Sequence, residues 1–466
     1  MSSSKSHKLD PTILREYDIR GIVSSTLSKL DVHVIGRVFG SMLIEKGGKS
    51  VAVGYDGRLS SPELEAALVE GLAASGAQVV RIGLGPSPML YFATEILPTD
   101  AGVMITGSHN PPEYNGLKLT IGSKPFFAED IRQLGQRAEA GNYIDGEGKV
   151  SRKSILVEYV SRLLADFKAG DGMPIKVAWD PGNGAAGQAV KMLTDRLPGR
   201  HTVLNEKIDG TFPAHHPDPT IEKNLSQLKK AVENHKCDLG IAFDGDGDRI
   251  GVVDSRGRVM WGDQLLVILA AEVIKEHPGA IIIADVKASS VFFDEITRMG
   301  GQPLMWKTGH SHIKNKMMET GALLAGEMSA HIFFKHRYYG FDDALYVAIR
   351  LLSAINKQGK SLASMLDSLP IMINTPELRI DCAENRKFEV VFEVHKRLLG
   401  VDGITVNDID GVRVQTKDGW WLLRASNTQA ALVARCESIN AKGLKKLKDE
   451  LRLQLYKSGI ALPKID

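Results

Sequence analysis

Three aspartates close together suggest a place where a cation could bind. Asp244, Asp246 and Asp248 alternate with glycine in the stretch LGIAFDGDGDRIGVVD, between two apolar segments. A tight loop between two buried strands can turn all three carboxylates toward one point, where their charges repel one another unless a cation neutralises them. Hard oxygen ligands suit magnesium, which usually completes its octahedron with water and phosphate oxygen. We therefore predict a magnesium site here, with a solvated acidic turn as the alternative.

A calcium-binding EF-hand begins with the same alternation of aspartates. Its loop also needs glycine at the sixth position and a bidentate glutamate at the twelfth. This chain has Arg249 and Ser255 at those positions. The flanking segments also have the character of strands rather than helices, so the EF-hand is excluded.

A single serine is displayed in the stretch ITGSHNPPEYNGLKLT. Ser108 follows the apolar run AGVMI, which predicts a buried strand, and Gly107, Pro111 and Pro112 interrupt both helix and strand around it. It therefore lies beyond the carboxyl end of a strand, where open α/β sheets gather their ligands. No G-x-S-x-G elbow surrounds it. The alternative is a turn serine that bonds its own backbone.

Two further loops place polar residues in an apolar setting. In LLAGEMSAHIFF, Glu327, Ser329 and His331 break a strand-turn-strand pattern, and a carboxylate beside a hydroxyl suits vicinal sugar hydroxyls. In LLRASNTQAALV, Arg424 can hold a phosphate through two parallel bonds, while neighbouring hydroxyls and amides fill the remaining lone pairs. An ordinary polar turn explains each loop equally well on its own.

The elements that would position these loops follow an α/β pattern. One strand-loop-helix theme recurs three times at intervals of roughly a hundred residues, which predicts three domains of related topology. The three copies are KSVAVGYDGR before SPELEAALVEGLAASG, IKVAWDPGNG before AAGQAVKMLTDRL, and AIIIADVKASS before VFFDEITRMGG. Near the end of the chain, the strands GVRVQTK, WWLLRAS and ALVARCES run close together before a terminal helix, which predicts an antiparallel α+β domain.

Length and composition narrow the class of protein. A chain of 466 residues is too long for one core, and interruptions of periodicity predict domains over residues 1–153, 154–256, 257–369 and 370–466. The 58 basic and 56 acidic residues nearly cancel, which excludes a nucleic-acid or membrane-surface partner recruited by net charge. The three cysteines share no metal-like spacing, and no apolar run approaches the ~20 residues of a membrane span. We expect a soluble cytoplasmic protein with reduced thiols.

Together the four loops resemble those of the α-D-phosphohexomutase superfamily, in particular bacterial phosphomannomutase/phosphoglucomutase. The resemblance covers nearly the whole chain. It rests on REYDIRG, TGSHNPPEYNGLK, DGDGDR, GEMSAH and RASNT in the family's order, with FPAHHPDPT, WKTGHS and FKHRYYGFDDALY between them. The resemblance implies four domains around a central cleft. The first three would share one mixed α/β topology, and the fourth would have an α+β fold like that of the TATA-binding protein.

The resemblance also implies an isomerase of carbohydrate metabolism. Ser108 would be phosphorylated in the resting enzyme and would phosphorylate the free hydroxyl of a hexose 1- or 6-phosphate, of mannose or glucose. The bound 1,6-bisphosphate would then turn end for end and return its other phosphate. One Mg²⁺ per chain, on Ser108 and the three aspartates, would neutralise charge during transfer. Glucose 1,6-bisphosphate would be activator and intermediate, and hexose phosphates would be the partners. We expect a monomer, with a dimer as the alternative.

The remaining site residues are assigned by the same resemblance. Arg20, Lys118 and Arg249 would lie near the transferred group, where positive charge favours the transition state. The candidates for proton exchange are His109, Lys118, His310 and His331, although each histidine could equally be a structural residue. The substrate-binding residues would be Tyr17, Lys287, Glu327, Ser329, Arg424, Ser426, Asn427 and Thr428.

Two positions depart from the family pattern. Ala330 stands where relatives commonly have glycine, and Gln429 and Ala430 replace a turn that usually contains proline, so we expect substrate affinity to be affected more than the reaction class. The alternatives are phosphoglucosamine mutase and a non-catalytic sugar-phosphate-binding protein. Met328 stands where the former typically has glutamine, which favours a neutral hexose. The retained Ser108 and aspartates argue against the latter.

Overall fold

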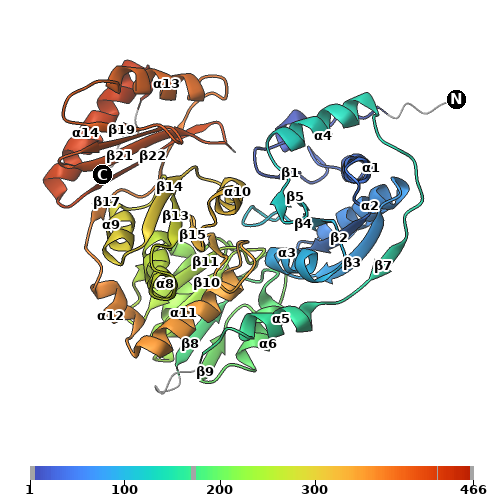
Figure 1. Ribbon diagram of the computed structural model, residues 1–466, viewed down its shortest axis with the longest axis horizontal. Coiled ribbons are helices and arrows are strands. Elements are labelled where there is room, and N and C mark those ends of the chain that lie inside the picture. The colour runs from blue at the N-terminus through green and yellow to red at the C-terminus, as the bar shows by residue number, and fades with distance from the viewer. Residues whose placement is uncertain (1–5, 169–174, 428, 462–466) are drawn as a thin grey trace.

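The computed structural model describes residues 6–168, 175–427 and 429–461, which form four α/β units in succession along the chain. In Figure 1 the chain runs from the blue first unit on the right, through the green and yellow second and third units, to the red fourth unit at upper left. Each unit is built on its own sheet.

The first unit is a seven-stranded mixed sheet. Its strands are β1 (Ile19–Ile22), β2 (Ser50–Tyr55), β3 (Gln78–Leu84), β4 (Ala101–Ile105), β5 (Tyr114–Ile121), β6 (Lys124–Pro125) and β7 (Val150–Arg152). Its helices are η1 (Pro11–Ile13), α1 (Lys29–Glu45), α2 (Ser61–Ala74), α3 (Ser87–Ile96) and α4 (Glu129–Ala140). The buried residues of α1, α2 and α4 form one core, whereas those of α3 join a core shared with the next two units.

The second unit is a five-stranded sheet and the third a four-stranded sheet. The second contains α5 (Leu156–Leu164), β8 (Lys176–Asp180), α6 (Gly187–Thr194), β9 (Arg200–Val203), η2 (Glu222–Leu225), α7 (Ser226–Asn234), β10 (Leu239–Phe243), β11 (Ile250–Asp254) and β12 (Val259–Met260). The third contains α8 (Gly262–Glu276), β13 (Ile281–Asp285), α9 (Ser290–Arg298), β14 (Gln302–Trp306), α10 (His310–Thr320), β15 (Leu324–Gly326), β16 (Ile332–Phe334), α11 (Ala344–Gln358) and α12 (Leu362–Asp367). Through β12 the second sheet continues to Met260, past the boundary expected after residue 256.

The predicted three-fold recurrence is confirmed at the level of strand order. The sheets contain the equivalent series β5-β4-β2-β3, β11-β10-β8-β9 and β16-β15-β13-β14. In each series three strands are parallel, and the first-named strand is antiparallel to its neighbour. The antiparallel strand follows its neighbour directly through a hairpin. The Ser108, aspartate and Glu327 loops are these three hairpins, in equivalent positions.

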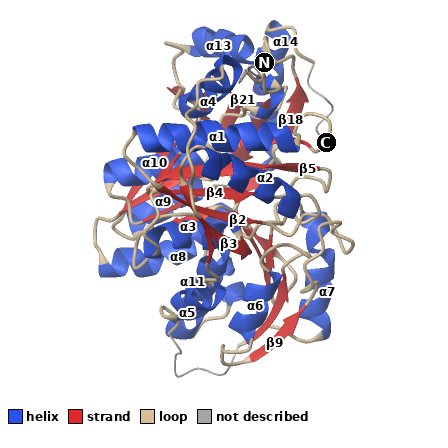
Figure 2. Cartoon of the chain, turned by 90° about the vertical axis from the view of Figure 1, so that its right-hand side faces the viewer, coloured by secondary structure: helices blue, strands red, loops and turns tan. Residues whose placement is uncertain are grey.

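The fourth unit is a six-stranded antiparallel sheet. It contains β17 (Ile373–Asn374), β18 (Leu378–Asp381), α13 (Lys387–Leu398), β19 (Thr405–Asn407), β20 (Val412–Thr416), β21 (Gly419–Ala425), β22 (Ala431–Ser438) and α14 (Ala441–Lys457). Both helices contribute to a core with one face of the sheet, and Figure 2 shows them together at the top of the molecule. On the other face, Trp420 and Leu422 pack against Val286 of the third unit.

Candidate active site

Ser108 is buried in the hairpin between β4 and β5. Its backbone is in the left-handed region, with φ at +48°, which is uncommon for a residue with a side chain. Its N–H donates to Thr106 Oγ1 at 2.8 Å. Its Oγ donates to Asp244 Oδ2 at 3.0 Å and lies 3.2 Å from His109 Nδ1. The turn therefore directs the hydroxyl at the acidic hairpin of the second unit.

Arg58, which the sequence analysis did not single out, holds this turn in place. It lies just after β2, and only 1% of its surface is exposed. Its two terminal nitrogens donate to four carbonyl oxygens of the turn, those of Ser108, Asn110, Pro111 and Tyr114. A planar guanidinium with several donors can bind four acceptors in this way.

Asp56, two residues earlier, completes this support and was also missed. Its carboxylate accepts from the N–H of Arg58, the hydroxyl of Thr106 and the N–H of Gly107. The only sequence signal for either residue is the stretch GYDGR at the end of a buried strand. Together the two side chains pair with each other and fix the backbone on both sides of Ser108.

The aspartates of the second unit form a compact buried cluster. Asp244, Asp246 and Asp248 are fully buried, and their ligand atoms lie within 4.8 Å of one another. Burial, and then the charges of its two neighbours, raise the pKa of Asp244 well above its usual value. Asp246 Oδ1 and Asp248 Oδ1 are buried without a hydrogen-bond partner among the described residues. Clustered hard oxygens with unpaired lone pairs fit a divalent cation such as Mg²⁺.

Lys118 brings a positive charge to the same cluster. Its Nζ is 2.6 Å from Asp246 Oδ2 and also contacts Asp248. Burial alone would lower the pKa of Lys118, but the two carboxylates outweigh it and raise that pKa well above its usual value. The ammonium in turn outweighs the effect of burial on Asp246 and holds its pKa below the usual range. Ser87 Oγ donates to the same Asp246 oxygen.

Two arginines flank the reacting loops. Arg20 donates to Gly107 O at 2.8 Å and to the side chain of Asn110, so it also holds the serine turn. Arg249 Nε donates to His331 Nε2 at 2.9 Å, and the backbones of these two residues form an isolated β-bridge between the second and third units. Burial would lower the pKa of Arg249, but nearby carboxylates outweigh it and raise that pKa.

The histidine candidates differ in their surroundings. Burial, and then the charges of Arg249 and Arg20, lower the pKa of His109 well below its usual value. Burial and Lys314 do the same for His310, whose ring lies beside those of Tyr17 and His331. Of the four proton-exchange candidates, His109 and Lys118 contact the Ser108 and aspartate loops directly. His331 also contacts the aspartate hairpin, because its Nε2 accepts from Arg249 and its Nδ1 lies 3.6 Å from Asp248 Oδ1 and 3.0 Å from Asp342 Oδ2.

The hairpin of the third unit carries Glu327 and Ser329. Glu327 is buried, which raises its pKa, and its Oε1 accepts from Gly309 N at 2.6 Å. Ser329 is half-buried in the same turn. Ala330 has φ at +67°, so this alanine occupies the left-handed region that favours glycine. Lys287, just after β13, is buried with its Nζ 3.1 Å from Glu377 Oε2.

The hairpin of the fourth unit brings Arg424, Ser426 and Asn427 to the same region, while Thr428 lies outside the described residues. Arg424 Nε donates to Asp410 Oδ2 at 3.0 Å, and its Nη2 is buried without a partner among the described residues. Burial alone would lower the pKa of Arg424, but nearby negative groups, Asp410 first among them, outweigh burial and raise that pKa. Asn427 Nδ2 donates to Tyr17 OH at 2.5 Å, so the first and fourth units touch.

The turn that lacks the usual proline is held by side chains instead. Lys387 Nζ donates to the carbonyl oxygens of Ser426 and Gln429, and the side chain of Gln429 accepts from Arg379. Lys387 is almost fully buried. These bonds restrain the turn, as proline would otherwise do.

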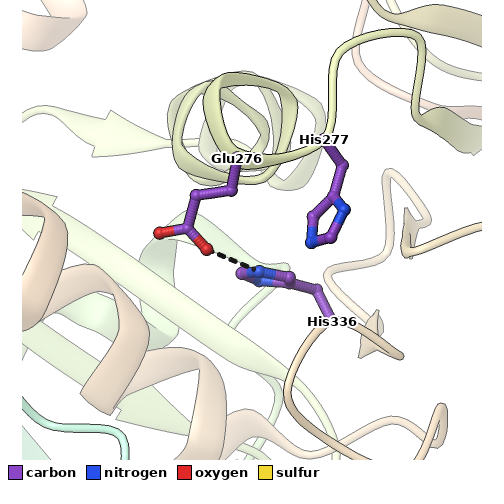
Figure 3. A group of neighbouring side chains, drawn as sticks. All are labelled: Glu276, His277 and His336. Carbon is purple, nitrogen blue, oxygen red and sulfur yellow. Dashed lines mark hydrogen bonds and ion pairs between the residues drawn. The ribbon is translucent and has the colours of Figure 1, made fainter.

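A second group of metal-ligand residue types lies elsewhere in the third unit, where Figure 3 shows Glu276, His277 and His336 facing one another. Both Glu276 oxygens accept from Arg337, and one also contacts His336 Nε2 at 3.0 Å. Arg350 donates to His336 Nδ1 at 3.0 Å, so Nε2 carries the ring hydrogen and has no lone pair for a metal. This group therefore does not suit a metal ion.

The site is thus drawn from all four units. The structure brings Ser108, His109, Lys118 and the three aspartates together, with Arg20 bonded to the same serine turn. It places Tyr17, Glu327, Arg424 and Asn427 in a second group around residues 308–309. Among the helices of the described ranges, none is both long and apolar enough to cross a membrane.

Family models match almost the whole chain. The models are those of phosphoglucomutase/phosphomannomutase: alpha/beta/alpha domain I matches residues 11–142, domain II residues 157–257, domain III residues 261–372, and the C-terminal domain residues 377–454. The four models follow one another in the order of the four sheets.

Individual relatives agree with the family models. The chain is 43% identical to a phosphomannomutase/phosphoglucomutase of Pseudomonas aeruginosa, over 99% of each chain. It is 41% identical to a phosphoglucomutase of Neisseria meningitidis, over 94% of this chain and 96% of that one. A solved structure of a phosphoglucomutase/phosphomannomutase family protein from Burkholderia thailandensis matches with a TM-score of 0.92 and 39% identity, over 98% of this chain and all of that one.

Proposed function

Since the chain belongs to the phosphoglucomutase/phosphomannomutase family and is a hexose phosphate mutase, we propose that Ser108 carries the phosphoryl group between the two ends of the sugar. The observation that carries this proposal is the 3.0 Å contact between Ser108 Oγ and Asp244 Oδ2, which joins two units. A buried serine that faces three buried carboxylates is of little use for simple sugar binding. It is well placed if its oxygen carries phosphate beside a cation.

In the proposed reaction, the bond from phosphorus to Ser108 Oγ breaks as a bond to the free sugar hydroxyl forms. The hydroxyl loses its proton, and Oγ gains one. In the second half-reaction the bond between the other phosphorus and its sugar oxygen breaks as a bond from that phosphorus to Oγ forms, so Oγ loses its proton and the freed sugar oxygen gains one. His109, neutral and 3.2 Å from Oγ, is the group placed to exchange that proton. Arg20 and Arg249 supply positive charge on the two flanks of the transferred group.

Asp244, Asp246 and Asp248 would hold one Mg²⁺ per chain, which would supply charge neutralisation at the transferred phosphate. The unpaired oxygens of Asp246 and Asp248 support this assignment. Lys118 contacts Asp246 and Asp248, so its positive charge would neutralise part of their negative charge and keep the loop compact.

The second group of residues would bind the rest of the substrate. Glu327 and Ser329 would bind sugar hydroxyls, whereas Lys287, Arg424, Ser426, Asn427 and Thr428 would hold the phosphate that lies away from Ser108. The unpartnered Nη2 of the buried Arg424 supports a bound anion here. Glucose 1,6-bisphosphate would occupy both groups at once.

The three cysteines are free and buried, which is consistent with action in the reducing cytoplasm.

A side-by-side kinetic assay tests the substrate class. We expect turnover of mannose 1-phosphate and glucose 1-phosphate, and much slower turnover of glucosamine 1-phosphate, because Met328 offers no amide to an amino group. Added glucose 1,6-bisphosphate should remove any lag. Faster turnover of glucosamine 1-phosphate than of the neutral hexoses would identify the phosphoglucosamine mutase alternative instead.

A further inference from the structure

The loop between β14 and α10 touches three parts of the site. Thr308 O accepts from Tyr17 OH of the first unit at 2.9 Å, and Gly309 N donates to Glu327 Oε1 at 2.6 Å. Gly309 has φ at +123°, and a Cβ there would lie 2.5 Å from the ring of Tyr17, so a larger residue does not fit. The position of this loop is therefore tied to the first unit and to the sugar-binding glutamate.

Asp410 ties the same loop to the fourth unit. Its Oδ2 accepts from Thr308 N at 2.9 Å and from Arg424 Nε at 3.0 Å. One carboxylate oxygen thus holds a backbone amide of the third unit and the guanidinium of the fourth. Neither contact was expected from the sequence, because Asp410 lies in the loop between β19 and β20, away from the four motifs.

The way Arg424 is held leaves it ready for an anion. Arg424 is 5% exposed, and the described residues provide no partner for its Nη2. A guanidinium that is bound through Nε keeps its two terminal nitrogens free for a bidentate contact with phosphate. Asp410 therefore fixes the plane of the guanidinium without using the atoms that would bind phosphate.

We propose that Asp410 is a positioning residue that makes the phosphate grip of Arg424 depend on the docking of the fourth unit against the loop at Thr308. This rests on the proposed function, in which Arg424 holds the phosphate that lies away from Ser108. When the fourth unit moves away, the Thr308 contact and the orientation of Arg424 are weakened together. Release of the bisphosphate for reorientation and its renewed capture are then one coupled event.

The effect of Asp410 is measured on binding, free of turnover. In the full-length Ser108→Ala protein, the Kd for glucose 1,6-bisphosphate is determined by calorimetry with and without Asp410→Ala. Loss of one charge-assisted contact should raise this Kd about ten- to a hundredfold. Asp410→Asn keeps both acceptor contacts and the shape of the side chain but removes its charge. The Kd of this variant should therefore lie between the value with Asp410 and the value with alanine. Asp408→Asn is the matched control, since Asp408 lies in the same loop with an exposed side chain, and its Kd should be unchanged.

A double-mutant cycle with Arg424→Ala separates a positioning role from a merely structural one. If Asp410 acts through Arg424, the effect of Asp410→Ala should shrink to less than about threefold once Arg424 is alanine. In the phosphorylatable enzyme, Asp410→Ala should raise KM by the same factor as Kd with kcat little changed, because the grip is shared by ground state and transition state.

The outcomes are distinct. If Asp410→Ala leaves Kd unchanged, or weakens binding equally with and without Arg424, the inference is overturned while the phosphate clamp stands. If Arg424→Ala itself leaves Kd unchanged, both the clamp and the inference fail. If Asp408→Asn weakens binding as much as Asp410→Asn, the effect is one of loop charge, which also overturns a specific role for Asp410.

Discussion

Replacement of Arg58 by lysine tests whether the serine turn is held from within the protein. Lysine keeps the positive charge, but its single nitrogen cannot reproduce the two terminal nitrogens with which Arg58 binds four carbonyl oxygens. At least two of those oxygens should lose their donor in a site that water scarcely reaches. We expect the turn around Ser108 to open far more often, and phosphoryl transfer to slow as a result.

The magnitude follows from the number of bonds lost. A hydrogen bond to a charged group contributes roughly 1.5–3 kcal/mol, so two lost bonds amount to at least about 3 kcal/mol if the turn does not rearrange. That free energy corresponds to an increase of about a hundredfold or more in the population of the open turn. Misplacement of Ser108 by a fraction of an ångström should lower kcat on the order of ten- to a hundredfold.

Hydrogen exchange followed by mass spectrometry measures the opening directly, in peptides that cover residues 106–114. Arg137→Lys is a matched control in the same unit, because Arg137 pairs with Glu45 in a partly exposed contact that contributes little. Exchange in the turn should rise by about a hundredfold in Arg58→Lys and stay unchanged in Arg137→Lys. Equal exchange in the two variants would refute the reasoning, since Arg58 would then be replaceable by any cation.

Three further predictions concern the carrier, the metal and pH. Ser108→Ala should abolish both the species that is heavier by one phosphate in intact-protein mass spectra and nearly all mutase activity, and a variant with ordinary turnover would contradict the carrier role. Asp246→Asn should weaken binding of Mn²⁺, followed by electron paramagnetic resonance, about tenfold or more because a charged ligand is lost, whereas unchanged affinity would exclude Asp246 from the metal site. Burial raises the pKa of Asp343 to about 7, even though Tyr159 and Tyr338 donate to it. Its folded pKa lies above the unfolded value, so its contribution to stability should fall as pH rises from about 4 to 7. Between pH 8 and pH 5, wild type should gain about 2–3 kcal/mol of unfolding free energy relative to Asp343→Asn, measured by urea titration, and parallel pH profiles would refute the shift.

The sequence predicted the fold class because its signals are local. The three strand-loop-helix copies have apolar runs of strand length followed by amphipathic segments, and the α/β repeat that they predict is confirmed. In the fourth unit β20, β21, β22 and α14 were recognised by the same means, whereas β17, β18 and β19 are short and partly exposed and gave no comparable pattern.

The motifs of the candidate site could be found because each concentrates unusual residues within one hairpin. Sequence reasoning could not find the supporting residues, because each contacts residues far away in the chain. These residues are Arg58, Asp410 and Lys387. Arg58 reaches a turn some fifty residues later, and Asp410 reaches Thr308 across a unit boundary. Nothing in the few residues around them distinguishes a buried clamp from an ordinary charged loop. Such support appears only when strands have been paired and units docked.

The equivalent hairpins of the three related units each contain one residue with positive φ, but a different residue type occupies that position in each. Each turn contains a residue in the left-handed region: Ser108 at +48°, Gly247 at +75° and Ala330 at +67°. At Gly247 a Cβ would lie 2.9 Å from Pro86 and 3.3 Å from Leu345, so only glycine fits.

At Ala330 the methyl group joins the buried core, and this apolar contact offsets part of the backbone strain. At Ser108 the strain is opposed by the bonds from Arg58 and Arg20 to the backbone of the turn. A side chain is therefore retained in the left-handed position where its hydroxyl is needed, and several buried polar bonds hold the backbone around it. The same argument explains why Arg58 should be far more sensitive to substitution than its place in an unremarkable loop would indicate.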